Sequence, residues 1–240
     1  MSLIYGHRGA SGYAPENTLE AFRMSMEMGA DGFELDVHLS RDGELVVIHD
    51  ETVNRTTNGT GAVRDLTLAQ LKELDACNGM EAYRGAKIPT LAEVFDLIRD
   101  THHLVNVEVK TDGIFYPEIE KKCVALAKEK GVEDRVLYSS FNHYTLMKLR
   151  QLKPDAKLGM LFGDVMVRPW EYAASISVDY LHPYKSNLRV PGFAEGARAA
   201  GMGVNLWTVN DAETMQMCLD NHVGIITNYP DVAVALRNKI

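Results

Sequence analysis

Hydrophobic and polar positions alternate most clearly between residues 31 and 49. Three apolar and three polar residues take turns in the run Phe33-Glu34-Leu35-Asp36-Val37-His38. A period of two predicts a β-strand whose apolar side chains share one face and whose polar side chains share the other. The Asp42-Gly43 turn and the apolar run 45–48 predict a second, antiparallel strand that leads to His49.

Glu34 and Asp36 share the polar face of the first predicted strand. Two neighbouring carboxylates are costly unless a cation or a titrating group lies between them. The second strand brings the imidazole of His49 close to both, so one interpretation is a catalytic or metal-binding site. The other is an ordinary β-hairpin with a solvated polar face, and the hairpin alone does not distinguish the two.

The rest of the chain repeats a strand followed by a helix. Apolar runs predict strands at 3–5, 104–110, 136–140, 157–161, 178–181, 204–207 and 224–227. A first helix is expected from Asn17, its N-cap, to Gly29. Further helices are predicted at 91–98, 117–130, 143–152, 169–175, 192–200, 211–220 and 230–238. With the hairpin counted once, the chain contains eight strand–helix units.

Eight such units predict an α/β fold of the closed (β/α)8 or TIM-barrel type, in which functional groups lie at the carboxyl ends of the strands. An open, doubly wound sheet is the alternative. That fold carries a glycine-rich phosphate loop after its first strand. The sequence Gly6-His7-Arg8-Gly9-Ala10-Ser11-Gly12 lacks the required GxGxxG spacing, which favours the barrel.

Residues 51–88 interrupt the repeat. They are polar and rich in turn-forming residues, with one short helical pattern at 66–74. Long irregular excursions of this kind are commonly lids or binding loops. We therefore expect one catalytic domain over residues 1–240, with a small insertion at 51–88 after the second strand of the barrel.

The composition restricts the partners that the protein can have. A formal net charge of −8 argues against a nucleic-acid partner, because phosphate backbones bind to basic surfaces. No apolar run approaches the ~18 residues of a membrane span, so membrane insertion is not expected. The start of the chain does not resemble a signal peptide, and the three cysteines are widely spaced. We expect a cytoplasmic protein that acts on a small molecule, and the sequence does not indicate its oligomeric state.

Polar residues gather at the predicted carboxyl ends of the first three barrel strands. They are His7, Arg8, Glu34, Asp36, His49, Glu108 and Lys110. Three carboxylates without a thiol or a histidine cluster favour a hard divalent cation over zinc. The arginine and the lysine would bind an anionic group. The two histidines would supply an acid and a base, because imidazole titrates near neutral pH. These parts fit the hydrolysis of a phosphodiester.

The same residues belong to motifs that resemble those of the glycerophosphodiester phosphodiesterase family. The similar segments are His7-Arg8-Gly9, Pro15-Glu16-Asn17-Thr18, Glu34-Leu35-Asp36-Val37, Asp42-Gly43, His49-Asp50, Ile88-Pro89-Thr90-Leu91, Glu108-Val109-Lys110, Ser140-Phe141, 204–210 and 226–231. They occur in order along nearly the whole chain, so the resemblance does not depend on any single segment.

The resemblance implies a barrel with an insertion after its second strand. It also implies hydrolysis of glycerophosphodiesters to glycerol 3-phosphate and an alcohol. The roles that it implies are an acid–base pair, His7 and His49; ligands of Mg²⁺ or Ca²⁺, Glu34, Asp36 and Glu108; and phosphate contacts, Arg8 and Lys110.

Four further residues are candidates for substrate contacts, namely Glu16, Asn17, Phe141 and Trp207. The resemblance suggests a contact from Glu16 or Asn17, although Asn17 could serve only as a helix cap. Phe141 and Trp207 either fill the barrel core or line the substrate cleft, where an apolar wall beside a charged site is common. His38 leads into a turn and is expected behind the site or exposed. No role is assigned to the histidines that fit helix ends or loops, His102, His103, His143, His182 and His222.

Other classes of function remain open. A metal-dependent aldolase barrel also gathers acidic ligands at strand ends, but it does not explain two histidines. A catalytically inactive binding protein on the same fold would have no need of an intact set of site residues. A membrane-acting phospholipase of this architecture would need an exposed apolar or basic rim, and residues 51–88 are too polar to supply one.

Overall fold

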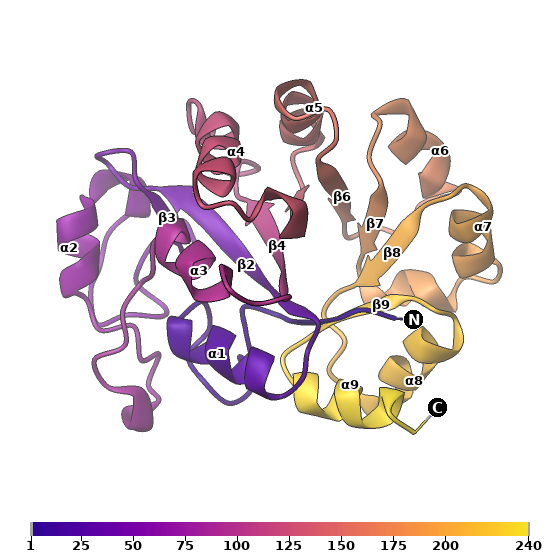
Figure 1. Ribbon diagram of the computed structural model, residues 1–240, viewed down its shortest axis with the longest axis horizontal. Helices are drawn as coiled ribbons and strands as arrows, with labels where there is room; N and C mark the ends of the chain where they lie inside the picture. Colours follow the sequence, from indigo (N-terminus) through magenta and orange to yellow (C-terminus); the bar gives the residue numbers. More distant parts are fainter. Residues whose placement is uncertain (1, 240) are drawn as a thin grey trace.

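The computed structural model describes residues 2–239, and within this range eight parallel strands close into a barrel (Figure 1). The strands are β1 (Ile4–Gly6), β2 (Gly32–Leu39), β4 (Leu104–Val109), β5 (Val136–Ser140), β6 (Lys157–Phe162), β7 (Tyr180–Pro183), β8 (Gly203–Leu206) and β9 (Gly224–Thr227). β1 pairs with both β9 and β2, which closes the ring. The hairpin strand β3 (Leu45–Val47) is antiparallel to β2 and is not part of the parallel ring.

Helices surround the strands, as Figure 1 shows. They are α1 (Leu19–Glu27), α3 (Leu91–Ile98), α4 (Ile119–Glu129), α5 (His143–Leu152), α6 (Pro169–Ser175), α7 (Phe193–Ala199), α8 (Ala212–Asp220) and α9 (Pro230–Arg237). A short additional helix, α2 (Leu68–Glu73), lies in the segment 51–88. The predicted TIM barrel is therefore confirmed. No helix in residues 2–239 combines the length and the apolarity that crossing a membrane requires.

Local sequence determines where these helices begin. At α3 the hydroxyl of Thr90 accepts from the N–H of Glu93, and the Glu93 carboxylate accepts from the N–H of Thr90, which is a capping box. At α1 the cap is Thr18, whose hydroxyl accepts from the N–H of Ala21. The prediction of Asn17 as the N-cap is therefore wrong. Asn17 has a positive φ of 57°, and its side chain points toward β2 instead.

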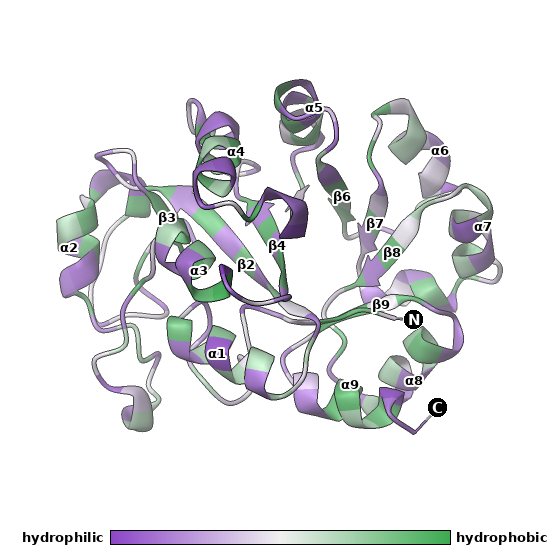
Figure 2. Ribbon diagram, viewed as in Figure 1, coloured by the Kyte–Doolittle hydropathy of each residue, from purple (hydrophilic) through white to green (hydrophobic). Residues whose placement is uncertain are grey.

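The alternating residues of β2 and β4 separate the hydrophobic core from the barrel interior. Phe33 of β2 stacks on Phe22 of α1 with ring centroids 4.4 Å apart, and Val107 of β4 is buried in the same cluster. The intervening polar residues, such as Glu34 and Asn106, line a cavity inside the barrel. Figure 2 shows bands of opposite hydropathy along β2. Because Glu34 is only 4 % exposed, the interpretation as a hairpin with a solvated polar face is wrong.

Residues 51–88 lie to one side of the barrel, around α2 at the left of Figure 1. They are attached to the hairpin by a small cluster of buried apolar side chains. Its members are Val46, Ile48, Val53, Val63, Leu71, Ala76 and Ile88. The insertion therefore packs directly on the segment that leads to His49.

Several strand boundaries differ from the prediction by one residue, and the largest shift is at β7. β7 begins at Tyr180 rather than at 178, because the turn that ends α6 occupies the preceding residues. Ser177 has a positive φ of 58°, and the N–H of Val178 donates to the carbonyl of Ala173 at 3.2 Å, which terminates the helix. His182 consequently lies within β7 and is fully buried, so its expected place at a helix end or in a loop is wrong.

Candidate active site

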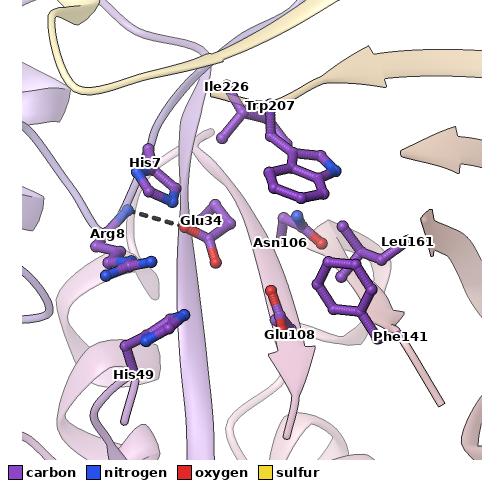
Figure 3. Close-up of a pocket in the computed structure, with 10 residues that line it drawn as sticks. All are labelled: His7, Arg8, Glu34, His49, Asn106, Glu108, Phe141, Leu161, Trp207 and Ile226. Carbon is purple, nitrogen blue, oxygen red and sulfur yellow. Dashed lines mark hydrogen bonds between the residues drawn. The ribbon is translucent and has the colours of Figure 1, made fainter. Parts of the chain in front are cut away.

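A cavity of about 60 Å³ lies among the carboxyl ends of the barrel strands (Figure 3). Its two sides differ in chemistry. The charged side presents His7, Arg8, Glu34, His49 and Glu108. The apolar side presents Phe141, Leu161, Trp207 and Ile226. In Figure 3 the two histidines stand at the left, facing the aromatic rings at the right across the carboxylates.

Glu34, Asp36 and Glu108 form one acidic cluster. β2 and β4 pair with Asp36 opposite Glu108, and one oxygen of each carboxylate lies within 4.8 Å of the others. All three side chains are buried. Burial, together with the charges of Asp36 and Glu108, raises the pKa of Glu34 well above its usual range. Burial and the charge of Asp36 likewise raise the pKa of Glu108. Three ionised carboxylates at this spacing need a positive partner.

Asp36 is the member of the cluster that most favours ionisation. Burial raises its pKa, but the Arg8 guanidinium, with Nε 3.5 Å from Oδ2, acts together with His49, Lys110 and the hydrogen bond from Asn17, and these groups jointly hold the pKa of Asp36 at about 2. Asn17 donates from Nδ2 to the same oxygen at 2.9 Å. The other oxygen, Oδ1, has no hydrogen-bond partner in the part of the chain that the structure describes. An unpartnered buried carboxylate oxygen beside two further carboxylates fits Mg²⁺ or Ca²⁺, because both ions prefer oxygen ligands.

Two cationic side chains flank this cluster. Arg8 has a positive φ of 55°, and its backbone N–H donates to Glu34 Oε2 at 2.9 Å. Its guanidinium lines the cavity and donates to Glu16 Oε1 at 2.7 Å. Lys110 is buried behind the cavity and donates from Nζ to Glu108 Oε1 at 2.8 Å. Arg8 therefore faces the cavity and Lys110 lies behind it, and the expected phosphate contacts of both residues stay predictions.

His7 directly follows β1 and points into the cavity. Its Nδ1 lies 2.7 Å from the side-chain oxygen of Asn228. Because an amide oxygen can only accept, Nδ1 carries the proton of the neutral ring, and Nε2 remains an acceptor. Burial and the neighbouring Arg8 lower the pKa of His7 from 6.5 to about 4. The ring is therefore neutral at pH 7 and able to take up a proton.

His49 lies after β3, on the same side of the cavity as His7. Its Nδ1 donates to Asp50 Oδ1 at 2.7 Å, which orients the ring. Its backbone carbonyl accepts from Nε2 of His38 at 3.0 Å, and Nδ1 of His38 accepts from the hydroxyl of Tyr116 at 3.0 Å. His38 is thus buried behind the site and holds the backbone of His49, whereas the alternative of an exposed residue is wrong.

Phe141 and Trp207 form much of the apolar side. Their rings meet edge to face with centroids 5.4 Å apart. The indole N–H of Trp207 donates to the backbone carbonyl of His182 at 2.7 Å, which fixes the ring. Both aromatic residues directly follow barrel strands and line the cavity. Of the two interpretations left open by the sequence, the geometry supports the cleft wall over core filling.

Glu16 and Asn17, the other candidate substrate contacts, are not among the cavity-lining residues in the described part of the chain. Each instead holds a residue of the site from behind. Glu16 accepts from the guanidinium of Arg8, and Asn17 donates to Asp36. Their contact with substrate stays a prediction, and their observed contacts are supporting ones.

Three supporting side chains had no assigned role in the sequence analysis, namely Asp50, Arg55 and Asn228. Asp50 and Asn228 hydrogen-bond the two histidines, and Arg55 hydrogen-bonds Asp50. Asp50 and Asn228 lie in segments that resemble the family motifs, which is the signal that could have identified them. Arg55 lies in the irregular insertion, where no periodic pattern marks it.

The chain is similar to known proteins over nearly its whole length. The model of the glycerophosphoryl diester phosphodiesterase family matches residues 7–232. A protein of Caldanaerobacter subterraneus subsp. tengcongensis, named glycerophosphodiester phosphodiesterase, is 46% identical over 240 residues, which cover 99% of this chain and 98% of the relative.

Solved structures give the same result. A glycerophosphodiester phosphodiesterase from Agrobacterium tumefaciens matches with a TM-score of 0.87 and 32% identity, covering 98% of this chain and 100% of the other. A phosphodiesterase from Oleispira antarctica, solved in complex with the product sn-glycerol-3-phosphate, matches with a TM-score of 0.92 and 30% identity. That match covers 99% of this chain and 97% of the other. The chain therefore belongs to the glycerophosphoryl diester phosphodiesterase family, a family of hydrolytic enzymes.

Proposed function

We propose that the protein hydrolyses glycerophosphodiesters to glycerol 3-phosphate and an alcohol, with the help of a divalent cation and two histidines. The observation that carries the proposal is the meeting of His7, His49 and Arg8 with the acidic cluster at one cavity. Membership of the family supports the reaction class. The relative from Oleispira antarctica, with sn-glycerol-3-phosphate bound as product, supports the identity of the phosphorylated product.

Glu34, Asp36 and Glu108 would hold the cation, which we propose to be Mg²⁺ or Ca²⁺. Their fit to such an ion rests on their all-oxygen donor set and on the unpartnered Oδ1 of Asp36. A cation bound there would offset negative charge on a phosphate oxygen. Arg8 would add a second positive charge, in a planar fork that matches the geometry of phosphate. Lys110 would contribute a point charge from behind the cluster.

His7 would act as the general base and His49 as the general acid. The neutral ring of His7, with its Nδ1–H engaged by Asn228, presents a bare Nε2 that can take a proton. His49 donates from Nδ1 to Asp50, whose carboxylate can offset the positive charge of a doubly protonated ring. The two rings therefore have partners suited to opposite roles, an amide for the base and a carboxylate for the acid.

The nucleophile that we propose is the 2-hydroxyl of the substrate's own glycerol. His7 takes the proton of this hydroxyl, its oxygen bonds to phosphorus, and the bond from phosphorus to the departing alcohol breaks. His49 gives its proton to that departing oxygen. Water then attacks the phosphorus of the cyclic phosphate. The bond from phosphorus to the 2-oxygen breaks, and glycerol 3-phosphate is formed. Intramolecular nucleophiles reach effective molarities of ~10⁵–10⁸ M, against about 55 M for water.

Direct attack by water is the competing route, and it uses the same residues. A diester in which propane-1,3-diol replaces glycerol lacks the neighbouring hydroxyl and distinguishes the two routes. On the proposed route this compound should be hydrolysed at least ~10²-fold more slowly than the natural diester, because the intramolecular advantage is lost. A rate near the natural one would identify water as the nucleophile.

The function itself is tested by measuring glycerol 3-phosphate released from glycerophosphocholine, -ethanolamine, -glycerol and -inositol, each with and without Mg²⁺ or Ca²⁺. We expect release that depends on the cation, and the rates would identify the preferred alcohol. A His7→Ala/His49→Ala double variant controls for contaminating hydrolases. Failure of the folded protein to release product from any of the four diesters would contradict the proposal.

An aldolase-type reaction and a purely binding role are less well supported. The partners of the two histidines, Asn228 and Asp50, equip both rings for proton transfer, which a purely binding role does not require. An aldolase-type reaction does not explain why two histidines face one cavity beside Arg8. A small-molecule substrate is supported by the relative from Oleispira antarctica, which was solved with sn-glycerol-3-phosphate bound. We keep the cytoplasm as the proposed location, supported by the three cysteines, none of which is paired in the described residues.

A further inference from the structure

Arg55, in the insertion, joins the two loops that carry groups of the site. Its guanidinium makes four hydrogen bonds to two carboxylates. Nε and Nη2 donate to Asp50 at 2.8 and 2.9 Å. Nη1 and Nη2 donate to Glu16 at 2.7 and 2.9 Å. One planar group therefore links the segment after β3 to the segment after β1.

Each of these carboxylates has a second partner that lines the cavity. Asp50 accepts from Nδ1 of His49 at 2.7 Å, and Glu16 accepts from Nη1 of Arg8 at 2.7 Å. The hydrogen-bonded chain runs from His49 through Asp50, Arg55 and Glu16 to Arg8. Arg55 stands at its centre, between an imidazole that moves a proton and a guanidinium placed for phosphate.

The two carboxylates in this hydrogen-bonded series of side chains favour the ionised form that Arg55 requires as a partner. The hydrogen bonds of Arg55 lower the pKa of Asp50. Burial raises the pKa of Glu16, but the hydrogen bonds and charges of Arg55 and Arg8 together outweigh this, and the pKa of Glu16 is lowered. Arg55 itself is 45% exposed. Isolated ion pairs at such exposure contribute little to folding, whereas a bidentate network of this kind fixes the positions of its members.

We propose that Arg55 is a positioning residue that sets the placement of His49 and Arg8 through Asp50 and Glu16. The effect of Arg55 on the reaction rate rests on the proposed function, whereas its effect on the placement of His49 and Arg8 does not. Displacing a reacting group by about 1 Å can cost ~10²-fold in rate, so orienting two groups at once is effective. The insertion thereby takes part in the chemistry, in addition to any use as a lid or binding loop.

Arginine suits this position better than lysine. The guanidinium forms a rigid fork with several donors in one plane, whereas an ammonium is a single mobile charge. Four hydrogen bonds to two carboxylates use that fork fully. A lysine at residue 55 could neutralise the two carboxylates but could not fix both of them in one plane.

The kinetic test compares three variants of the full-length protein. Arg55→Gln should lower kcat by ~10–100-fold, the range seen when a partner that orients an active-site ligand is removed. Arg55→Lys should fall between this variant and wild type. Arg84→Gln is the matched control, because Arg84 lies in the same insertion, is 72% exposed and pairs with Glu81. The control should keep the kcat of wild type, and all three variants should keep its thermal unfolding midpoint.

A variant cycle separates positioning from a general structural effect. In an Asp50→Asn/Glu16→Gln background both carboxylates that Arg55 holds are removed. Adding Arg55→Gln to this background should then change kcat by less than about two-fold, because its effect is already lost. A full additional loss in that background would overturn the proposal, as would a kcat within two-fold of wild type for Arg55→Gln alone.

A second measurement does not depend on activity. Long-range ¹H–¹⁵N spectra of the histidine rings report whether Nδ1 of His49 holds a hydrogen-bonded proton. This proton should be observed in wild type and Arg84→Gln, and it should exchange or broaden in Arg55→Gln. An unchanged signal in Arg55→Gln would overturn the positioning role even in a protein without phosphodiesterase activity. Conversely, loss of the signal in a protein inactive on every diester would refute the proposed function and retain the positioning role.

Discussion

The two sides of the cavity are built from different parts of the barrel. The charged side comes from the ends of β1, β2 and β4 and from the hairpin that follows β2. The apolar side comes from the ends of β5, β6, β8 and β9, where the chain keeps its strand–helix repeat. The charged groups therefore come from three adjacent strands of the ring, and His49 is added by the hairpin that departs from the repeat.

The side chains on the two sides also differ in how many polar partners they require. Four of the five charged or titratable groups of the cavity have a polar side-chain partner: Asn228 for His7, Asp50 for His49, Glu16 for Arg8 and Lys110 for Glu108. The fifth, Glu34, accepts from the backbone N–H of Arg8. A partly buried charge without such a partner would be costly. The apolar side needs mainly volume, with one hydrogen bond from the indole of Trp207. We therefore expect changes on the charged side to reduce kcat and changes on the apolar side to affect KM.

Removal of the cation should have the largest effect. EDTA should abolish hydrolysis, and added Mg²⁺ or Ca²⁺ should restore it, because the acidic cluster would otherwise carry uncompensated charge beside an anionic substrate. Glu34→Ala or Asp36→Ala should weaken cation binding, measured by titration calorimetry. Glu44→Ala, at an exposed position outside the cavity, is the control. Full activity of enzyme stripped of metal would exclude the assignment of these residues as ligands.

Loss of either histidine should have the next largest effect. Removing a positioned acid or base commonly costs ~10²–10⁴-fold in rate, so His7→Ala and His49→Ala should each lose about that much kcat with a smaller change in KM. His222→Ala, in the loop between α8 and β9, should behave as wild type. A variant at position 7 or 49 that stays within a few-fold of wild type would remove that histidine from the mechanism.

The sequence predicts the charged side well because the information is local. Alternation in β2 places Glu34 and Asp36 on one face, and the return strand brings His49 near them. The parallel pairing of β2 with β4 then adds Glu108. What the pattern could not show is that this polar face is enclosed by a barrel, since alternation looks the same for a solvated hairpin.

The supporting partners were harder to predict because their contacts are distant in sequence or lie in irregular structure. Asn228 meets His7 across 221 residues, at the closure of β9 on β1. Arg55 meets Glu16 across 39 residues from a segment without periodicity. The sequence predicts Asn17 as the cap of α1. In the structure Asn17 has a positive φ and Thr18 is the cap, so the side-chain amide of Asn17 donates to Asp36 instead. Such contacts depend on tertiary structure that no local pattern encodes.

The pH dependence should identify which histidine is the base. Burial and Arg8 lower the pKa of His7 to about 4, so its ring stays neutral until the pH falls to that value. If His7 is the base, the acid limb of kcat/KM at saturating cation should lie near pH 4. At pH 5.5 the enzyme would then keep most of its activity, whereas a base with the ordinary value of 6.5 would lose about 90 %. An acid limb near pH 6.5 would assign the base to another group and reverse the proposed roles.

The apolar side should show the smallest effect and a different one. Phe141→Ala removes a ring that lines the cavity and packs edge to face on Trp207. Bound substrate and transition state should lose this wall equally, so KM should rise by ~8-fold if ~50 Å² of apolar contact is lost at ~25 cal/mol per Å², while kcat stays within about two-fold. Tyr144→Ala is the matched control, because Tyr144 lies three residues further along the chain and is 82% exposed. A fall in kcat comparable to that of His7→Ala would mean that the aromatic wall acts in the transition state, and the division of labour between the two sides would then be wrong.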